Sequence, residues 1–219
     1  WSLVFSRFIP VRSNTGRGYC CCNDHRRNEV KKQETMKTSK KIAITAVLLA
    51  ICIVSQFFKN LSVYITGPIV NLCLILATMT AGLLWGSILA LITPVTAFFI
   101  AASPVMTAVP FIIPFIMLGN EVLVLMVHFC FKPAVSAGSN AANSKSIAMA
   151  VLSSVAKGCF MGLTISLWLL PTFIPQASPL RDKMSIFQAT FSLTQFISAL
   201  IGFLYYYIVR IPIRKAGIQ

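Results

Sequence analysis

Apolar residues run from Lys41 to Tyr207 with few interruptions, in six stretches separated by short breaks of glycine, proline or charged residues. The stretches are continuously apolar, whereas the strands of a transmembrane barrel alternate apolar and polar residues over about ten positions. A helix needs roughly 20 apolar residues to cross the hydrocarbon core of a bilayer. The pattern therefore predicts an all-α, polytopic membrane protein, a bundle of six transmembrane helices over residues 42–58, 68–85, 86–102, 109–131, 146–170 and 186–209.

Small residues predict how these helices pack. The fifth predicted helix carries a small residue at every fourth position, including a GxxxG step from Gly158 to Gly162. Such stripes let helix backbones approach closely, which drives association in lipid, and we expect this one to pack within the bundle. The second and third helices are expected to join through a tight hairpin at residues 84–87. The first helix has a patch of small residues that suits a partner helix, formed by Ala43, Ala46 and Ala50.

Composition and charge support a membrane protein and predict its orientation. Of the 219 residues, 57% are hydrophobic and 11% are charged, which is too apolar for a soluble domain. The net charge is +14, but ten of the 19 Lys and Arg residues lie in the first 41 positions. This basic stretch has no folded nucleic-acid-binding module, so we expect no nucleic-acid partner. From Met36 onward, the loops on the N-terminal side carry eight basic residues against three on the other side, so we predict that both termini are cytoplasmic.

The first 35 residues differ from the rest of the chain. They are polar, basic and patternless, and Met36 then opens a short lysine-rich segment that leads into the first apolar run. That arrangement is typical of the start of a bacterial inner-membrane protein. We therefore predict that Met36 is the native initiator, that residues 1–35 are a non-native or disordered basic leader, and that residues 36–219 form the membrane domain.

Two opposite charges, Glu121 and Lys157, lie near the middle of the fourth and fifth predicted helices. A charge at membrane depth costs roughly 2.5–3.5 kcal/mol even on the gentler insertion scales, so it generally faces a bundle interior or a water-filled cavity. Both residues are expected near the membrane midplane. They form either a structural ion pair that fixes the helix register or part of a binding site, and the sequence leaves both alternatives open.

Other polar residues are predicted to gather in the same region. Positions seven and eleven after Lys157 lie on roughly the same helix face as the lysine. Polar residues also recur in the outer halves of the second and sixth helices. Because buried amides without partners are costly, several of them on inward faces indicate either a hydrogen-bonded core or a cavity that holds a polar ligand. The predicted ligand-binding residues are Asn71, Asn120, Glu121, Lys157, Thr164, Trp168, Gln188 and Gln195.

Sequence motifs give no support for catalysis or for a cofactor. The chain has no HExxH, no GxSxG and no paired aspartates, and its cysteines and histidines have no metal-site spacing. It has no GxxxxGK[ST] loop, so it cannot drive transport with ATP by itself. We expect neither an enzyme nor a metal or cofactor site. Two other interpretations stay open: a non-transport scaffold of the cell-envelope machinery and, less favoured, an intramembrane enzyme with Glu121 as acid or base.

Several segments carry a resemblance to a known family. They are Gly67-Pro68-Ile69-Val70-Asn71, Ala81-Gly82-Leu83-Leu84-Trp85-Gly86, Ile113-Pro114-Phe115-Ile116-Met117-Leu118-Gly119-Asn120 and Ala156-Lys157. Together they resemble the S components of energy-coupling factor (ECF) transporters, in a branch of unknown substrate. The resemblance covers residues 36–211.

The resemblance implies a substrate-capture subunit of an importer in the bacterial cell membrane. Such a subunit binds a water-soluble vitamin or a precursor from outside and docks on a transmembrane coupling subunit that carries two ATPases. In this family an AxxxA-type face of the first helix meets the coupling subunit, and the first loop closes over the ligand. The step from Ala46 to Ala50 matches that face, whereas Ile42 and Val54 depart from it, and the loop corresponds to residues 59–67.

Overall fold

The computed structural model describes residues 19–58, 63–101, 103–136, 143–174 and 178–215, with side chains from residue 38 to residue 211 except at 59–64 and the other gaps. Within these ranges the chain forms helices and short turns, and no strand is present among them. The all-α prediction is therefore confirmed. The chain divides into two units, Trp1–Ser39 and Lys40–Gln219. The second unit contains the buried apolar clusters and the cavity.

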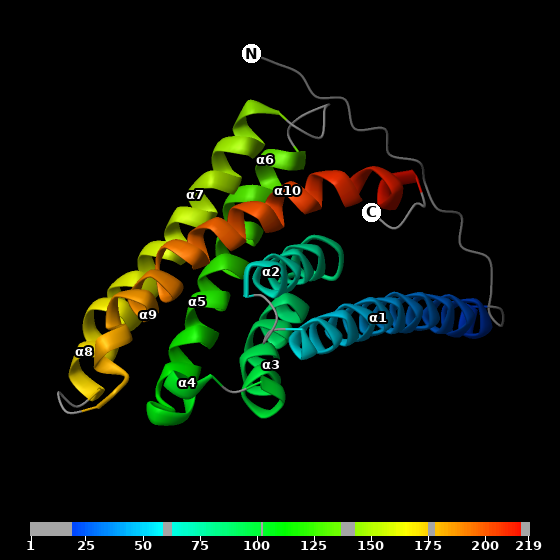
Figure 1. The fold of residues 1–219 in the computed structure, drawn as a ribbon. Helices are drawn as coiled ribbons and strands as arrows, with labels where there is room; N and C mark the ends of the chain where they lie inside the picture. Colours follow the sequence, from blue (N-terminus) through cyan, green and yellow to red (C-terminus); the bar gives the residue numbers. More distant parts are fainter. Residues whose placement is uncertain (1–18, 59–62, 102, 137–142, 175–177, 216–219) are drawn as a thin grey trace, which may run out of the picture. The chain divides into compact units, whose positions relative to one another are not determined.

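The helices follow one another with short connections (Figure 1). Two of the long helices contain a π-helical segment: η1 joins α5 to α6, and η2 joins α7 to α8, without a break. The elements are α1 (Tyr19–Phe57), α2 (Val63–Thr80), α3 (Leu83–Ala101), α4 (Pro104–Ala108), α5 (Ile112–Met126), η1 (Val127–Phe131), α6 (Lys132–Ser136), α7 (Ser144–Met161), η2 (Gly162–Leu169), α8 (Leu170–Phe173), η3 (Arg181–Lys183), α9 (Met184–Phe191) and α10 (Leu193–Lys215).

Within the described residues, five helical stretches are long and apolar enough to cross a membrane. They correspond to the first, third, fourth, fifth and sixth predicted spans. The second predicted span corresponds to Ile65–Thr80 in α2, an apolar helix that is shorter than the other five. The five stretches are Thr38–Phe57, Leu83–Ala101, Ile112–Ser136, Ser144–Phe173 and Arg181–Ile211.

The turn between α2 and α3 lies earlier than the sequence indicated. It is formed by Ala81 and Gly82, so the predicted hairpin at residues 84–87 is wrong and those residues belong to α3. Gly82 has φ +102°, a conformation that glycine adopts without the steric cost of a Cβ. The backbone N–H groups of Ala81 and Gly82 both donate to the carbonyl of Ala77, at 2.8 and 3.1 Å, which ends α2. Gly82 lies two residues before the predicted hairpin, and the glycine inside that hairpin, Gly86, belongs to α3.

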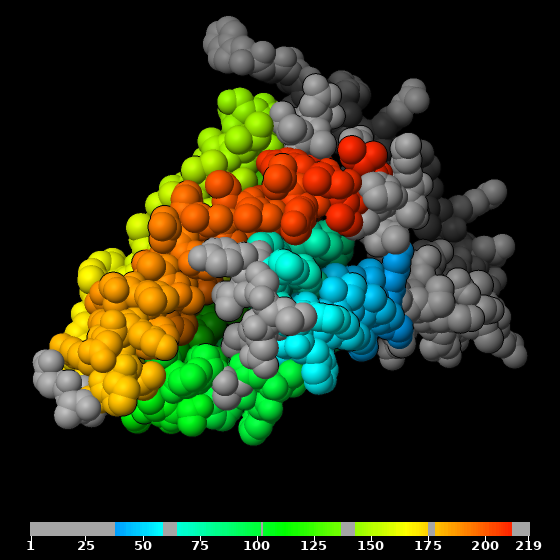
Figure 2. All heavy atoms as spheres, in the orientation of Figure 1, coloured from blue at the N-terminus to red at the C-terminus, as the bar shows by residue number. Residues whose placement is uncertain are grey.

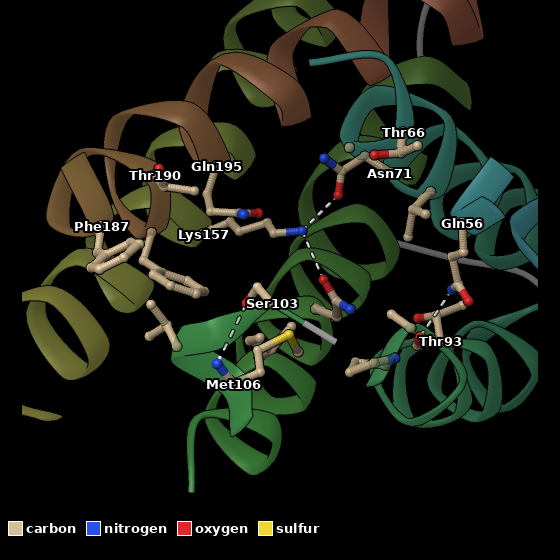
Figure 3. A pocket seen from close by; sticks show the side chains of 18 of the residues that line it. Gln56, Thr66, Asn71, Thr93, Ser103, Met106, Lys157, Phe187, Thr190 and Gln195 are labelled. Carbon is tan, nitrogen blue, oxygen red and sulfur yellow. Dashed lines mark hydrogen bonds between the residues drawn. The ribbon is translucent and has the colours of Figure 1, made fainter. Parts of the chain in front are cut away.

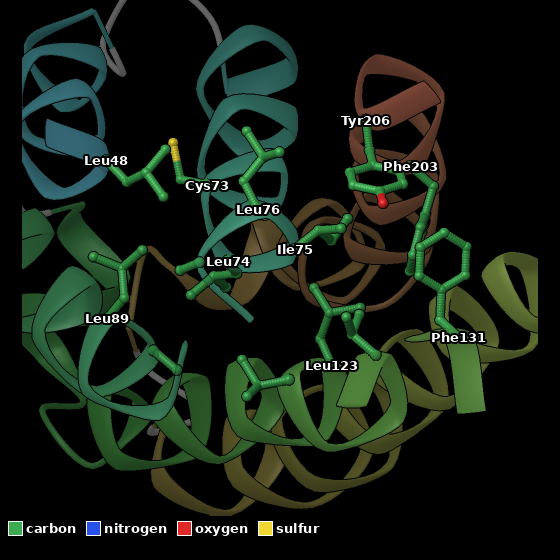
Figure 4. Packing of buried hydrophobic residues seen from close by; sticks show 14 of the residues in the cluster. Leu48, Cys73, Leu74, Ile75, Leu76, Leu89, Leu123, Phe131, Phe203 and Tyr206 are labelled. Atoms are coloured by element: carbon green, nitrogen blue, oxygen red, sulfur yellow. The ribbon is translucent and has the colours of Figure 1, made fainter. Parts of the chain in front are cut away.

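The interior of the bundle is built around α2 (Figure 4). Leu74, Ile75 and Ala77 of α2 are fully buried, and they pack in one cluster with residues of α3, α5 and α10. The aromatic ring of Phe131 in η1 closes this cluster by edge contacts with Phe203 and Tyr206 of α10. Because lipid tails are as apolar as these side chains, the packing itself, rather than escape from solvent, favours the assembled state.

Glycines bring three helices into close contact. At Gly202 of α10, an added Cβ would lie 2.9 Å from Asn71 Cβ and 3.3 Å from the carbonyl oxygen of Pro68, both on α2. At Gly158 of α7, an added Cβ would lie 2.8 Å from Phe196 Cβ on α10. The stripe on the fifth predicted span therefore packs inside the bundle, as we expected.

We expect Gly202→Ala to destabilise the protein, because the new methyl group meets α2 backbone that cannot move independently of Asn71. Overpacking of this kind typically costs about 1–3 kcal/mol. Gly162→Ala is the matched control, since its Cβ would meet only Ser192 Cβ, at 3.2 Å, and the Ser192 Cα at 3.9 Å. Thermal unfolding of both variants in detergent should show the larger loss for Gly202→Ala, and equal losses would contradict this account of the α2–α10 contact.

Candidate functional site

A cavity of about 340 Å³ lies among the helices of the bundle. Its lining comes from the C-terminal ends of α1 and α3, the N-terminal halves of α2 and α5, α4, the later part of α7, and α9 with the start of α10. In an up-and-down bundle these segments share one end of the molecule. Figure 2 shows the face on which α9 and α10, in orange, and α4, in green, border a recess.

Lys157 reaches from α7 into this cavity and is only 2% exposed (Figure 3). Its Nζ donates hydrogen bonds to Asn71 Oδ1 at 2.6 Å and to Asn120 Oδ1 at 2.8 Å. Asn71 belongs to α2 and Asn120 to α5, so a single amine joins three helices. The two amide oxygens stabilise the lysine in an interior where an unpaired ammonium would be very costly.

Asn71 is itself held on its other side. Its Nδ2 donates to Ser198 Oγ of α10 at 3.0 Å, and that hydroxyl donates to the carbonyl of Gln195 at 3.1 Å. The amide of Asn71 is therefore oriented by partners on both α7 and α10. Close approach of α2 and α10 at Gly202 makes this contact possible. The result is a connected polar network in which the position of the lysine is fixed by the fold.

The wall formed by α1 and α3 carries a second polar pair. Gln56 Nε2 donates to the carbonyl of Thr93 at 3.0 Å, and both side chains are 2% exposed and line the cavity. Gln56 Oε1 and Thr93 Oγ1 are buried and have no hydrogen-bond partner among the described residues. Buried polar atoms are normally satisfied, so this pair retains hydrogen-bonding capacity beside the cavity.

The remaining walls are mostly apolar. Phe187 and Phe191 of α9, Ile116 of α5 and Met106 of α4 all line the cavity. Ser103 begins α4, where its Oγ accepts from the backbone N–H of Met106 at 3.4 Å, and it also lines the cavity. Small-molecule sites typically combine such apolar walls with a few polar groups, in volumes of about 300–1,000 Å³. The cavity has the size and lining of a site for a compact ligand.

Four of the eight predicted ligand-binding residues line this cavity: Asn71, Asn120, Lys157 and Gln195. The other four do not. Thr164 donates to the carbonyl of Phe160 in its own helix, and Gln188 Nε2 donates to the carbonyl of Ser166. Trp168 is 56% exposed and packs its ring edge against Phe115. Half of the predicted ligand-binding residues therefore meet at the cavity, and the other half lie elsewhere.

Glu121, the fourth, does not line the cavity. Its Oε1 accepts from Ser87 Oγ of α3 at 2.6 Å, while Oε2 is buried and has no partner among the described residues. Asn120 and Glu121 are consecutive on α5, so their side chains leave the helix about 100° apart and only one of them can face the cavity. Among the described residues Lys157 makes its hydrogen bonds with amides and forms no ion pair with Glu121. Of the two alternatives that the sequence left open, the ion pair between Glu121 and Lys157 is therefore not formed in the described part of the chain.

Several polar residues of the lining were not among the predicted ligand-binding residues. Gln56 lies two residues before the end of the first predicted span, where a polar residue is easily taken as a boundary. The others are hydroxyl residues, which are common in membrane helices because they bond their own backbone. The missed residues are Gln56, Thr66, Thr93, Ser103 and Thr190.

Two further predictions concern the periphery. Ala43, Ala46 and Ala50 are all exposed on α1, so their patch is accessible to a partner. The predicted lid, residues 59–67, lies partly outside the described residues. Its last part, residues 63–67, forms the first turns of α2, and Thr66 and Gly67 line the cavity.

No group of three or more His, Cys, Asp or Glu side chains in the described part of the chain is arranged to hold a metal ion. Comparisons of the chain with protein-family models, with curated proteins and with solved structures find no match.

We expect Asn71→Ala to lower the thermal stability, because it removes one acceptor from a buried amine and the partner of Ser198. The loss should be about 1–3 kcal/mol, the usual cost of a buried polar group left unsatisfied. In Lys157→Met the amine is absent, so the same asparagine substitution should cost less there. A double-mutant cycle measured by unfolding in detergent tests this, and strictly additive losses would show that the two side chains are not coupled.

Proposed function

We propose that this protein is the substrate-binding membrane subunit of an ECF-type importer in the bacterial cell membrane. It captures a vitamin or a related micronutrient from outside and delivers it to an ATP-driven coupling module. The observation that carries the proposal is the cavity around Lys157, because a buried, multiply bonded lysine at the wall of a ligand-sized space is costly to maintain without a ligand to bind.

The position of the cavity supports capture from outside. If the N-terminus is cytoplasmic, as the charge distribution predicts, then α1 and α3 end at the outer surface, and α2 and α5 begin there. The cavity is lined by those outer ends, together with α9, which begins on the same side. A ligand entering from the exterior would reach the amine of Lys157 after passing the apolar side chains of α4 and α9.

The chain also needs partners to transport a ligand. It has no phosphate-binding loop of the kind that drives ATP hydrolysis, so energy has to come from separate ATPase subunits joined through a transmembrane coupling subunit. The exposed patch of Ala43, Ala46 and Ala50 on α1 supports such docking, because small residues let a partner helix approach closely.

We expect Lys157→Met to abolish uptake of the natural ligand while membrane insertion remains intact, since methionine fills similar space but provides no donor. Mass spectrometry of small molecules that co-purify with the native protein would identify the ligand, and the same molecule should be absent from the variant. Uptake by cells that contain the coupling module then measures transport. Unchanged binding and uptake in Lys157→Met would contradict the role assigned to the cavity.

We expect Ala46→Trp to reduce co-purification of the coupling subunit and the ATPases by about tenfold or more, because the indole prevents close helix approach. The ligand should still co-purify, since Ala46 is remote from the cavity lining. Leu204→Trp is the matched control, because Leu204 is 57% exposed on α10, outside the α1 patch. Recovery of cell-wall synthesis proteins in place of ATPases would favour the scaffold interpretation.

A further inference from the structure

The cavity carries one ionisable group among its described lining residues, and that group is Lys157. Glu121, the acid next to Asn120 in the sequence, does not line the cavity and accepts a hydrogen bond from Ser87 of α3 instead. A bound molecule would therefore meet a single cation without a fixed anion beside it. A site for a zwitterion would instead present a positive and a negative side chain to its ligand.

The hydrogen-bond inventory shows which donors remain for a ligand. A lysine ammonium has three donors, and Lys157 uses two of them on the oxygens of Asn71 and Asn120. Asn120 accepts through Oδ1, and its Nδ2 donates to no described residue. Since Oδ1 and Nδ2 share one carbon, the amide N–H group lies beside the lysine amine. The cavity wall thus offers an ammonium donor and a neighbouring amide donor, which together match the two oxygens of a carboxylate.

We infer that the ligand is a compact organic monocarboxylate whose carboxylate binds Lys157 Nζ and Asn120 Nδ2. The inference rests on the proposed function only in taking this cavity as the binding site. A monocarboxylate brings one negative charge to one lysine, so the pair is neutral in an apolar environment. A phosphate monoester brings about 1.5–2 negative charges, and the excess would stay uncompensated.

The rest of the cavity fits the body of such an acid. Phe187, Phe191 and Ile116 provide apolar walls for a ring or a short chain. The volume of about 340 Å³ is at the lower end of the range for small-molecule sites, which favours a ligand of modest size. Gln195 also lines the cavity, and its amide makes no hydrogen bond with a described residue, so it can bind a polar group on that body.

Binding measurements on the full chain in lipid nanodiscs test the inference without any coupling module. The probes are benzoate and indole-3-acetate, their neutral counterparts benzamide and indole-3-acetamide, and phenyl phosphate. Thermal stabilisation up to about 10 mM detects affinities in the millimolar range. We expect the carboxylates to stabilise the protein more than their amides and more than phenyl phosphate.

An isosteric variant makes the test independent of folding defects. Asn120→Asp keeps the acceptor for Lys157 but places an anion where the free amide donor was. It should weaken binding of the carboxylates by about 10- to 100-fold, as expected for losing a charge-assisted hydrogen bond. Glu121→Gln is the control, because Glu121 does not line the cavity, and it should retain carboxylate binding.

Three results would overturn the inference: amides that bind as well as the acids, phenyl phosphate that binds best, or no stabilisation by either carboxylate. The test of the ligand class and the test of the proposed function can give different results. Carboxylate binding by a protein that recovers no ATPases from native membranes would support the ligand class and reject the importer. A neutral natural ligand in a protein that does recover ATPases would support the importer and reject the ligand class.

Discussion

One buried amine constrains much of this structure. Lys157 lies in the interior of a helical bundle, where it needs acceptors, and it finds them on α2 and α5. Satisfying those bonds sets the rotation of three helices about their axes. Asn71 extends the network to α10 through Ser198, and the glycine at 202 allows the required approach. Polar bonds and close packing thus depend on each other here, because the bond from Asn71 to Ser198 forms only where α2 lies against α10.

The same network leaves room for a ligand. The two asparagines hold the lysine from the side of α2 and α5, and the space toward α4 and α9 stays open and mostly apolar. Glu121, which could have neutralised the amine, is engaged with Ser87 in the contact between α3 and α5. The separation of the acid from the base is what gives the cavity a positive character. An ion pair in the same place would have produced a filled, electrically neutral core.

Irregular helix geometry explains why three of the predicted site residues, Thr164, Trp168 and Gln188, lie away from the cavity. Thr164 and Trp168 were placed on the face of Lys157 by assuming 3.6 residues per turn, but residues 162–169 form a π-helix with wider turns. The later residues are therefore rotated away from the lysine. The sixth predicted span is broken at Ser192, which separates α9 from α10. In α9, Gln188 Nε2 donates to the carbonyl of Ser166 in η2. No periodicity argument could have anticipated either irregularity.

The sequence by itself determined that the chain is helical, that several helices are apolar enough to cross a membrane, and that Lys157, Asn71 and Asn120 are inward polar residues. Those conclusions follow from local composition and periodicity, which every helix expresses independently. Only the tertiary structure decided which polar groups meet, that Gln56 and Thr93 belong to the cavity, and that Glu121 does not. Partner choice depends on helix rotation and backbone approach, which arise from packing among segments far apart in the chain.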